Sequence, residues 1–189
     1  MSAIYLFFLS LPFAPSLEPH LPALQVVIPL LAAPVCVLLR DAKLSWLWAL
    51  IVTWVSFAIA LVLLGKTLST GLIIYEMGNW PAPWGIEYRI DAANAVVLVI
   101  VTAIASVTLP YAKASIEREV PRARIYLFYL MYMLCMTGLL GITTTADAFN
   151  LFVFLEISSL SSYVLISLGQ NRRALTASYR YLIMGTLGA

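Results

Sequence analysis

Long apolar runs divide this sequence into segments of membrane-spanning length. A helix needs roughly 20 consecutive apolar residues to cross the hydrocarbon core of a bilayer, which is about 30 Å thick. Four runs of this length carry no charge, and a fifth is interrupted by a single acid, Glu156. The pattern predicts an all-α fold, a polytopic transmembrane helix bundle with five full spans. These spans are Leu21–Leu39, Leu44–Leu64, Ala92–Ala112, Ile125–Ala146 and Ala148–Gln170.

The last apolar run is shorter than the other five. It opens near Ala174 or Tyr179 and reaches Ala189. The residues after Arg180 would make about 14 Å of helix at ~1.5 Å per residue, which is less than half of a bilayer. We therefore expect this run to be the start of a sixth helix.

The first residues form an apolar segment of their own. The run Ile4–Ala14 is too short to span a bilayer, and Pro12 interrupts it. A signal peptide is the alternative, but signals normally carry a positive amino-terminal region, and no Lys or Arg precedes this run. The sequence thus predicts an N-terminal apolar segment, residues 1–20, followed by a transmembrane helical domain, residues 21–189.

One loop is long enough to hold structure of its own. It covers residues 65–90 and contains the sequence GNWPAPWG from Gly78 to Gly85. Two prolines and two glycines exclude a regular helix there. The alternation of apolar and polar residues in Ile86–Ile90 predicts a short strand or a hairpin cap.

Composition agrees with a protein that is solvated mostly by lipid. Hydrophobic residues make up 62% of the chain and charged residues 11%, against about 25% charged residues in soluble domains. This excludes a water-soluble enzyme, a disordered chain and a disulfide scaffold. The formal net charge of +2 is too small to indicate a nucleic-acid partner.

The distribution of Lys and Arg predicts the orientation of the spans. Nine of the eleven lie in the loops after the first, third and fifth spans or just beyond them, and only Lys66 and Arg89 fall on the opposite side. Cytoplasmic loops carry the excess of positive charge, so the side with nine is predicted to be cytoplasmic. The nine are Arg40, Lys43, Lys113, Arg118, Arg122, Arg124, Arg172, Arg173 and Arg180.

Glu156 is the candidate proton carrier, because an ionisable side chain in mid-membrane is costly and usually marks an ion or proton path. At 100° per residue, Ser159, Tyr163 and Gln170 project within about 60° of it, which predicts a polar stripe toward the cytoplasmic side. Asp147, at the outer start of this span, is a possible second acid.

Each of these residues also has a structural interpretation. Glu156 could be a protonated carboxyl bonded to a neighbouring helix. Small polar residues often pack membrane helices together, which applies to the serines around it. For Asp147, this is stabilisation of its carboxylate by the positive end of the helix dipole.

No cofactor or metal site is indicated by the sequence. Cys36 and Cys135 both fall inside apolar runs, where buried free thiols are common, and no paired ligand spacing is present. The chain shows no flavin, haem or iron–sulfur signature, so any electron transfer would belong to partner subunits.

Three segments resemble a known family. The sequence ADAFNLFVFLEISSLSSY, from Ala146 to Tyr163, resembles the fifth transmembrane helix of the antiporter-like subunits of Mrp-type Na⁺/H⁺ antiporters, respiratory complex I and membrane-bound hydrogenases. The segments Gly78–Ile86 and Tyr179–Gly188 are also similar. The resemblance is greatest to the D-type member of the Mrp antiporter and concerns the N-terminal part of such subunits.

The resemblance implies a function and its partners. It places the proton-handling glutamate of the family at Glu156 and implies a lysine on a later helix as its counterpart. It implies a proton-translocating subunit of a multisubunit monovalent cation/H⁺ antiporter in the cell (inner) membrane, with other membrane subunits as partners, the lipid bilayer as solvent, and H⁺ and Na⁺ as substrates. A proton-pumping subunit of an NADH-quinone oxidoreductase or hydrogenase complex is the alternative. A non-transporting assembly or scaffold subunit is a third hypothesis, of a different class.

The predicted orientation can be tested by cysteine labelling. Single cysteines placed in the loop between Lys113 and Arg124 should react with a membrane-impermeant maleimide in everted vesicles and not in intact spheroplasts. A cysteine near Trp84 should show the reverse pattern and serves as the matched control. Labelling of the 113–124 loop from outside would overturn the orientation.

Overall fold

The computed structural model describes residues 17–81 and 83–188, and most of them are helical. The elements in chain order are η1 (Glu18–His20), α2 (Leu21–Ala32), α3 (Val35–Leu39), α4 (Ala42–Thr70), β1 (Ile73–Glu76), η2 (Met77–Asn79), β2 (Glu87–Ile90), α5 (Ala92–Glu119), η3 (Arg122–Arg124), α6 (Ile125–Thr144), α7 (Ala148–Ser167) and α8 (Arg172–Gly188). The predicted N-terminal segment lies largely outside the described residues.

Five helical stretches of the described chain are long and apolar enough to cross a membrane, which confirms the five predicted spans. They are Glu18–Leu39, Ala42–Thr70, Ala92–Glu119, Arg122–Thr144 and Ala148–Ser167. Their ends differ from the predicted ones. The second and third helices continue into polar residues after their apolar runs, to Thr70 and Glu119, whereas the fourth and fifth end earlier than predicted, at Thr144 and Ser167. The last predicted run begins earlier than expected, since α8 starts at Arg172.

Aspartates cap the N-terminal ends of three of the long helices. The Asp91 carboxylate accepts a hydrogen bond from the backbone N–H of Asn94 at 2.8 Å, and Asp147 accepts one from Asn150 at 2.9 Å. Asp41 caps α4 in the same way. The first N–H groups of a helix have no partner within it, so these carboxylates satisfy donors that lipid cannot.

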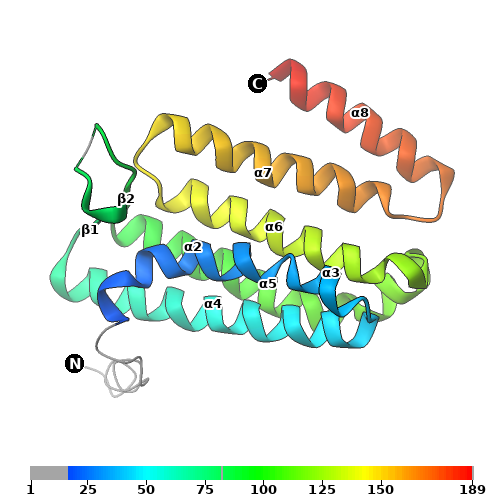
Figure 1. Cartoon of the computed structure of the whole chain (residues 1–189), viewed down its shortest axis with the longest axis horizontal. Helices are drawn as coiled ribbons and strands as arrows, with labels where there is room; N and C mark the ends of the chain where they lie inside the picture. The colour runs from blue at the N-terminus through cyan, green and yellow to red at the C-terminus, as the bar shows by residue number, and fades with distance from the viewer. Residues whose placement is uncertain (1–16, 82, 189) are drawn as a thin grey trace.

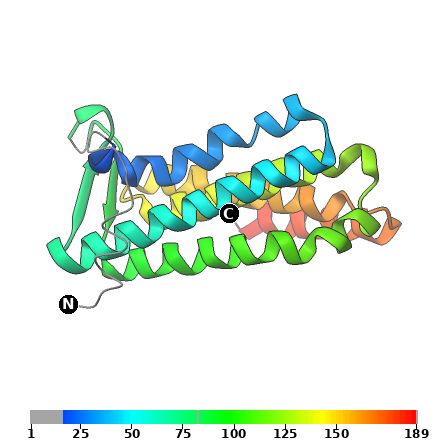
Figure 2. The ribbon, with the colours of Figure 1, turned by 90° about the horizontal axis from the view of Figure 1, so that it is seen from below.

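The helices run back and forth, so their loops gather at the two ends of the bundle (Figure 1). The turns between α3 and α4, α5 and α6, and α7 and α8 share one end, which is therefore the end rich in arginine and lysine. The hairpin formed by β1 and β2 lies at the other end, and Figure 2 shows it beside the start of α2 and α5. The structure thus places the predicted cytoplasmic cations together.

The first span is broken, which the sequence analysis did not predict. It consists of α2 and α3, with a turn at Ala33–Pro34 between them. Proline has no N–H, so Pro34 interrupts the ladder of hydrogen bonds. The indole N–H of Trp48 in α4 donates to the Ala32 carbonyl at 3.0 Å, which satisfies one of the groups exposed by the break.

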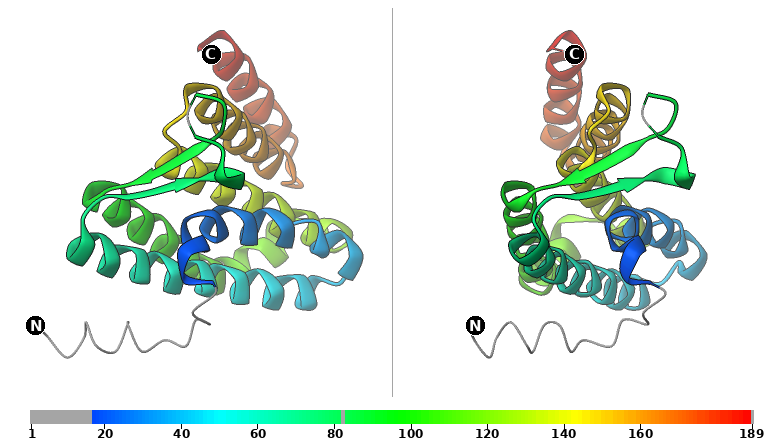
Figure 3. Two further views of the ribbon diagram at one scale, coloured as in Figure 1. Left: turned by 60° about the vertical axis from the view of Figure 1, so that its left-hand side comes forward. Right: turned by 90° about the vertical axis from the view of Figure 1, so that its left-hand side faces the viewer.

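The predicted hairpin exists and closes one end of the bundle. The strands β1 and β2 are antiparallel, with Tyr75 opposite Tyr88. The hairpin then reaches the α6–α7 loop, where Tyr88 bridges Thr145 and the N–H of Ala146 donates to Glu87 at 3.0 Å. Figure 3 shows the hairpin lying across the helix ends. This contact fixes the position at which α7 begins.

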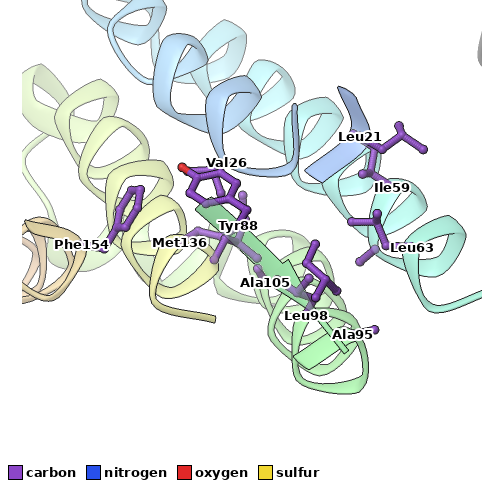
Figure 4. Packing of buried hydrophobic residues seen from close by; sticks show 13 residues of the cluster. Leu21, Val26, Ile59, Leu63, Tyr88, Ala95, Leu98, Ala105, Met136 and Phe154 are labelled. Carbon is purple, nitrogen blue, oxygen red and sulfur yellow. The ribbon is translucent and has the colours of Figure 1, made fainter. Parts of the chain in front are cut away.

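Two apolar clusters form the core, one toward each end of the bundle. The cluster near the hairpin joins Leu21, Ile59, Leu98 and Leu140 from four helices, and Tyr88 packs into it from β2 (Figure 4). The other cluster is centred on Tyr129 and Met133 of α6 and on Leu109 of α5, and its further members include Cys36, Ile116 and Ile125. Helix α6 contributes to both and is the centre of the bundle.

Helices α6 and α7 approach closely along two glycines. A Cβ added at Gly138 would lie 2.7 Å from the backbone nitrogen of Ser158 and 2.8 Å from the Phe154 carbonyl oxygen, and one at Gly141 would overlap the Phe154 ring. Small residues at such positions let membrane helices meet backbone to backbone. The α6–α7 contact therefore depends on the missing side chains.

Gly138→Ala should destabilise the protein by about 1–3 kcal/mol, as overpacking of a tight contact does. Two of the nearest atoms belong to the backbone and the third is the Cβ of Ser158, so none of them can rotate aside. Thermal unfolding in detergent measures the effect. Gly65→Ala in α4 is the matched control, because its Cβ would meet no atom within 4 Å; an equal effect of both replacements would contradict the close α6–α7 contact.

Candidate functional site

Helix α7 has two faces with different surroundings. The face toward α6 holds Phe154, Ser158 and Ser161, and at 3.6 residues per turn Glu156 points about 160° away from Phe154. The Ser161 hydroxyl donates to the Ile157 carbonyl at 2.6 Å, and this hydroxyl is buried. Ser161 is therefore satisfied by its own helix, whereas the Ser158 hydroxyl lies 3.9 Å from the Cys135 sulfur of α6, and both serines act in packing.

The opposite face of α7 lines a groove shared with α8. This groove has a volume of about 480 Å³, and it brings together Glu156, Ser159 and Tyr163, three of the residues predicted as a polar stripe. The other lining residues are Phe152 and Leu155 of α7 and Met184, Gly185 and Gly188 of α8. Glu156 is half-buried there.

Tyr163 joins the two helices that form the groove. Its ring meets Tyr181 edge to face, with the centroids 5.0 Å apart, and the Ser178 hydroxyl donates to the Tyr163 carbonyl at 2.7 Å. A Cβ at Gly185 would overlap the Tyr163 hydroxyl, so the glycine lets the phenol reach the backbone of α8. Figure 3 shows that α8 lies at the margin of the bundle beside α7.

The carboxyl of Glu156 faces the groove without a charged partner. Among residues 17–81 and 83–188, no Lys or Arg forms an ion pair with it. The packed bundle of α2, α4, α5 and α6 lies on the other side of α7. A cation that pairs with Glu156 would have to approach from the α8 side.

Gln170 does not join the other three residues of the predicted stripe. Helix α7 ends at Ser167, so the helical projection used for Gln170 no longer applies three residues later. Its N–H donates to the Glu119 carbonyl at 2.9 Å, and its side chain is exposed at the cation-rich end. There it lines a separate cavity of about 650 Å³, together with Arg118 and Asn171.

Asp147 has a structural role at the start of α7. It caps the helix through the Asn150 N–H, and the Asn150 side chain donates to the Thr145 hydroxyl at 3.1 Å. Burial raises the pKa of the nearby Tyr88 phenol, and a hydrogen bond with Asn150 acts in the opposite direction. Asp147 thus lies at the junction between the hairpin and α7 and is not among the residues that line the groove.

The residues that α8 contributes to the site were not predicted from the sequence. Gly185 and Met184 fall in the segment that resembles the family, but a single sequence does not show which helix they meet. Within the described part of the chain, no cluster of three or more His, Cys, Asp or Glu could hold a metal ion. The groove offers one carboxyl and two hydroxyls, a set suited to holding and passing protons.

Gly185→Ala should loosen α8 from α7, because the new methyl group overlaps the Tyr163 hydroxyl. The melting temperature in detergent should fall, and it should fall less in a Tyr163→Phe background, where the hydroxyl is gone. The relief is partial, since the added Cβ would still lie 2.9 Å from Cζ of the ring. Gly188→Ala, whose Cβ meets nothing within 4 Å, is the control on the same helix. Equal effects in both backgrounds would contradict this contact.

No protein-family model matches this chain, but individual relatives do. The N-type subunit of NADH-quinone oxidoreductase from Desulforudis audaxviator is 40% identical over 173 residues, which cover 90% of this chain and 34% of the relative. A putative mnhD2 antiporter protein of Staphylococcus haemolyticus is 31% identical over 171 residues, again covering 90% of this chain and 34% of the relative. The D-type subunit of the Na⁺/H⁺ antiporter from Alkalihalophilus pseudofirmus is 33% identical over 119 residues, which cover 63% of this chain and 24% of the relative.

Two solved structures have the same fold over most of the chain. One is the membrane-bound sulfane sulfur reductase, an archaeal respiratory membrane complex, with a TM-score of 0.81, 28% identity, and coverage of 88% of this chain and 34% of that one. The other is the Mrp complex from Dietzia sp. DQ12-45-1b, with a TM-score of 0.78, 24% identity, and coverage of 90% and 32%. The chain spans about a third of the length of these relatives. Over most of its residues, the chain is a homologue of the antiporter-like membrane subunits, as the Ala146–Tyr163 motif indicates.

Proposed function

We propose that this chain forms the proton-carrying part of an antiporter-like subunit in a multisubunit monovalent cation/H⁺ antiporter, with Glu156 as the proton carrier. The observation that carries the proposal is the groove between α7 and α8, in which Glu156, Ser159 and Tyr163 meet. The relative from Alkalihalophilus pseudofirmus, a component of a Na⁺/H⁺ antiporter, supports the same function.

The groove supports a path for protons along α7. Ser159 lies about 4.5 Å and Tyr163 about 10.5 Å along the helix from Glu156, at ~1.5 Å per residue. Hydroxyls both donate and accept hydrogen bonds, so with water between them they can hand a proton to or from the carboxyl. Tyr163 lies nearer the predicted cytoplasmic end, where the path would open.

The charge state of Glu156 would be set by a cation that approaches from the α8 side. An adjacent positive charge stabilises the carboxylate and favours release of its proton, and withdrawal of that charge favours uptake. The family resemblance implies a lysine on a later helix for this role. The direction in which Glu156 faces fits such a counterpart, because the described bundle places no cation beside it.

The partners in this proposal are other membrane subunits in the cell membrane. Both solved structures that share the fold are multisubunit membrane complexes. The half-exposed flank of α7 and the exposed apolar side chains of α8 would be covered by such neighbours or by lipid. H⁺ is the proposed substrate of Glu156, and Na⁺ is the proposed exchanged ion.

A redox-driven complex is the second candidate. It is favoured by the relative with 40% identity, which belongs to an NADH-quinone oxidoreductase. In that case the same carboxyl would move protons, and electrons would pass through other subunits. Affinity purification of the tagged protein from native membranes separates the two. Soluble subunits with flavin or iron–sulfur absorption would indicate the redox complex, and exclusively membrane subunits would indicate the antiporter.

Glu156→Gln should abolish cation/H⁺ exchange while the subunit still assembles, because glutamine keeps the size and hydrogen bonding of glutamate but cannot release a proton. Dye quenching in everted vesicles measures exchange, and blotting checks the subunit level. Glu156→Asp should retain partial exchange activity. Asp147→Asn, at the helix cap, should reduce exchange much less than Glu156→Gln does. Exchange at the wild-type rate in Glu156→Gln, at an equal subunit level, would show that the carboxyl is structural.

A further inference from the structure

In the described part of the chain, three polar side chains inside the bundle have unmet hydrogen-bonding capacity: Gln25 of α2 and, on α4, Ser45 and Ser56. Gln25 of α2 and Ser56 of α4 are both fully buried. Among the described residues, neither amide atom of Gln25 nor the hydroxyl of Ser56 has a hydrogen-bond partner. A buried polar group left unpaired costs roughly 1–3 kcal/mol, so such groups in native proteins are usually paired with protein or with ordered water.

The two side chains lie at the same level of the membrane. Helices α2 and α4 are antiparallel and are joined at both ends, by Glu18 with Lys66 at 3.5 Å and by Ala32 with Trp48 at 3.0 Å. Gln25 is midway in sequence between Glu18 of η1 and Ala32 of α2, and the midpoint of Lys66 and Trp48 of α4 falls beside Ser56. The preceding residues, Leu24 and Val55, fit this register because both are among the residues that line one groove on the outer surface of this helix pair.

The backbone adds a further acceptor at this level. Pro29 lies inside α2 and has no N–H, so the carbonyl of Gln25 loses the donor that the fourth following residue normally supplies. The position thus presents an amide side chain and a carbonyl to the interior of the bundle. Helix α2 packs against both α4 and α6 there, so lipid does not reach it.

The neighbouring buried hydroxyls do not supply the missing partners. Thr53 donates to the Leu50 carbonyl at 2.9 Å, and Thr102 donates to Leu98 at 2.7 Å. Ser106 lies 2.8 Å from the Thr102 carbonyl and 3.1 Å from the Thr53 carbonyl. These groups are satisfied by helix backbone, so at this level of the bundle Gln25 and Ser56 are left without partners among the described residues. The third unpaired group, the Ser45 hydroxyl, lies about 16 Å from Ser56 along α4 at ~1.5 Å per residue.

We propose that one water molecule is bound inside the bundle between Gln25 and Ser56. A buried water usually makes two to four hydrogen bonds, and the amide, the hydroxyl and the freed carbonyl offer that number. A metal ion is a poorer occupant, because the buried side chains of the described residues are all uncharged. The water would satisfy polar groups that lipid cannot.

This site is separate from the groove at Glu156. Gln25 and Ser56 lie between α2 and α4 on one side of α6, and Glu156 faces away from α6 on the far side of α7. The inference therefore does not rest on the proposed transport function, and replacements at the two sites have independent readouts.

A cryo-EM map of the protein in nanodiscs, with whatever subunits purify with it, tests the occupant at a resolution that shows ordered water. We expect a separate density peak within hydrogen-bond distance of the Gln25 amide and the Ser56 hydroxyl. A direct contact between the two side chains, or an empty gap, would overturn the proposal.

A double-mutant cycle tests whether the two side chains share one site. Gln25→Met and Ser56→Ala should each lower the melting temperature, and the double replacement should lower it by less than the sum, since neither side chain is then left unpaired by loss of the other. The matched control pairs Gln25→Met with Ser45→Ala. Ser45 is also fully buried on α4 but lies about 16 Å away at ~1.5 Å per residue, so those shifts should add. Additive shifts for Gln25 and Ser56 would also refute a shared water, whatever the map shows.

Discussion

Lipid cannot satisfy a hydrogen bond, and this constraint explains most of the structure. Every polar group at membrane depth needs a partner within the protein or an enclosed water. The long helices satisfy their backbones, and buried threonines such as Thr102 and Thr137 donate to carbonyls one turn back. Aspartates cap the helix starts. Glu156, which has no ion-pair partner among the described residues, and the unpaired Gln25 and Ser56 are exceptions to this pattern, and the two proposed sites are built on them.

One face of helix α7 packs against α6, and the opposite face carries Glu156. Toward α6 it presents Phe154 and small serines to Gly138 and Gly141, which allows a close contact without charge. The carboxyl of Glu156 is then left on the face that the bundle does not cover. A groove with α8 receives it there, beside two hydroxyls. The tight packing on one face fixes the rotation of the helix and so fixes where the carboxyl points.

Much of this architecture was predictable from the sequence, because run length and charge placement are local properties. The five spans, the hairpin loop and the gathering of cations at one end all follow from them. Ser159 and Tyr163 line the same groove as Glu156, since helical geometry holds to Ser167. Gln170 does not, because the helix ends before it, and periodicity does not show where a helix ends. Partners across helices could not be predicted, since nothing in one sequence places Gly185 against Tyr163 or Gln25 level with Ser56.

The central claim is that Glu156 faces α8 and points away from α6, and cysteine cross-linking tests it most directly. In a Cys36→Ser background, native Cys135 on α6 lies 3.4 Å from the Ser162 hydroxyl, so Ser162→Cys should form a disulfide with it on mild oxidation. In a Cys36→Ser, Cys135→Ser background, Glu156→Cys should instead cross-link to Met184→Cys on α8 through a short bifunctional maleimide. Glu156→Cys should not cross-link to native Cys135. Efficient linkage of position 156 to Cys135, with none to position 184, would contradict the account.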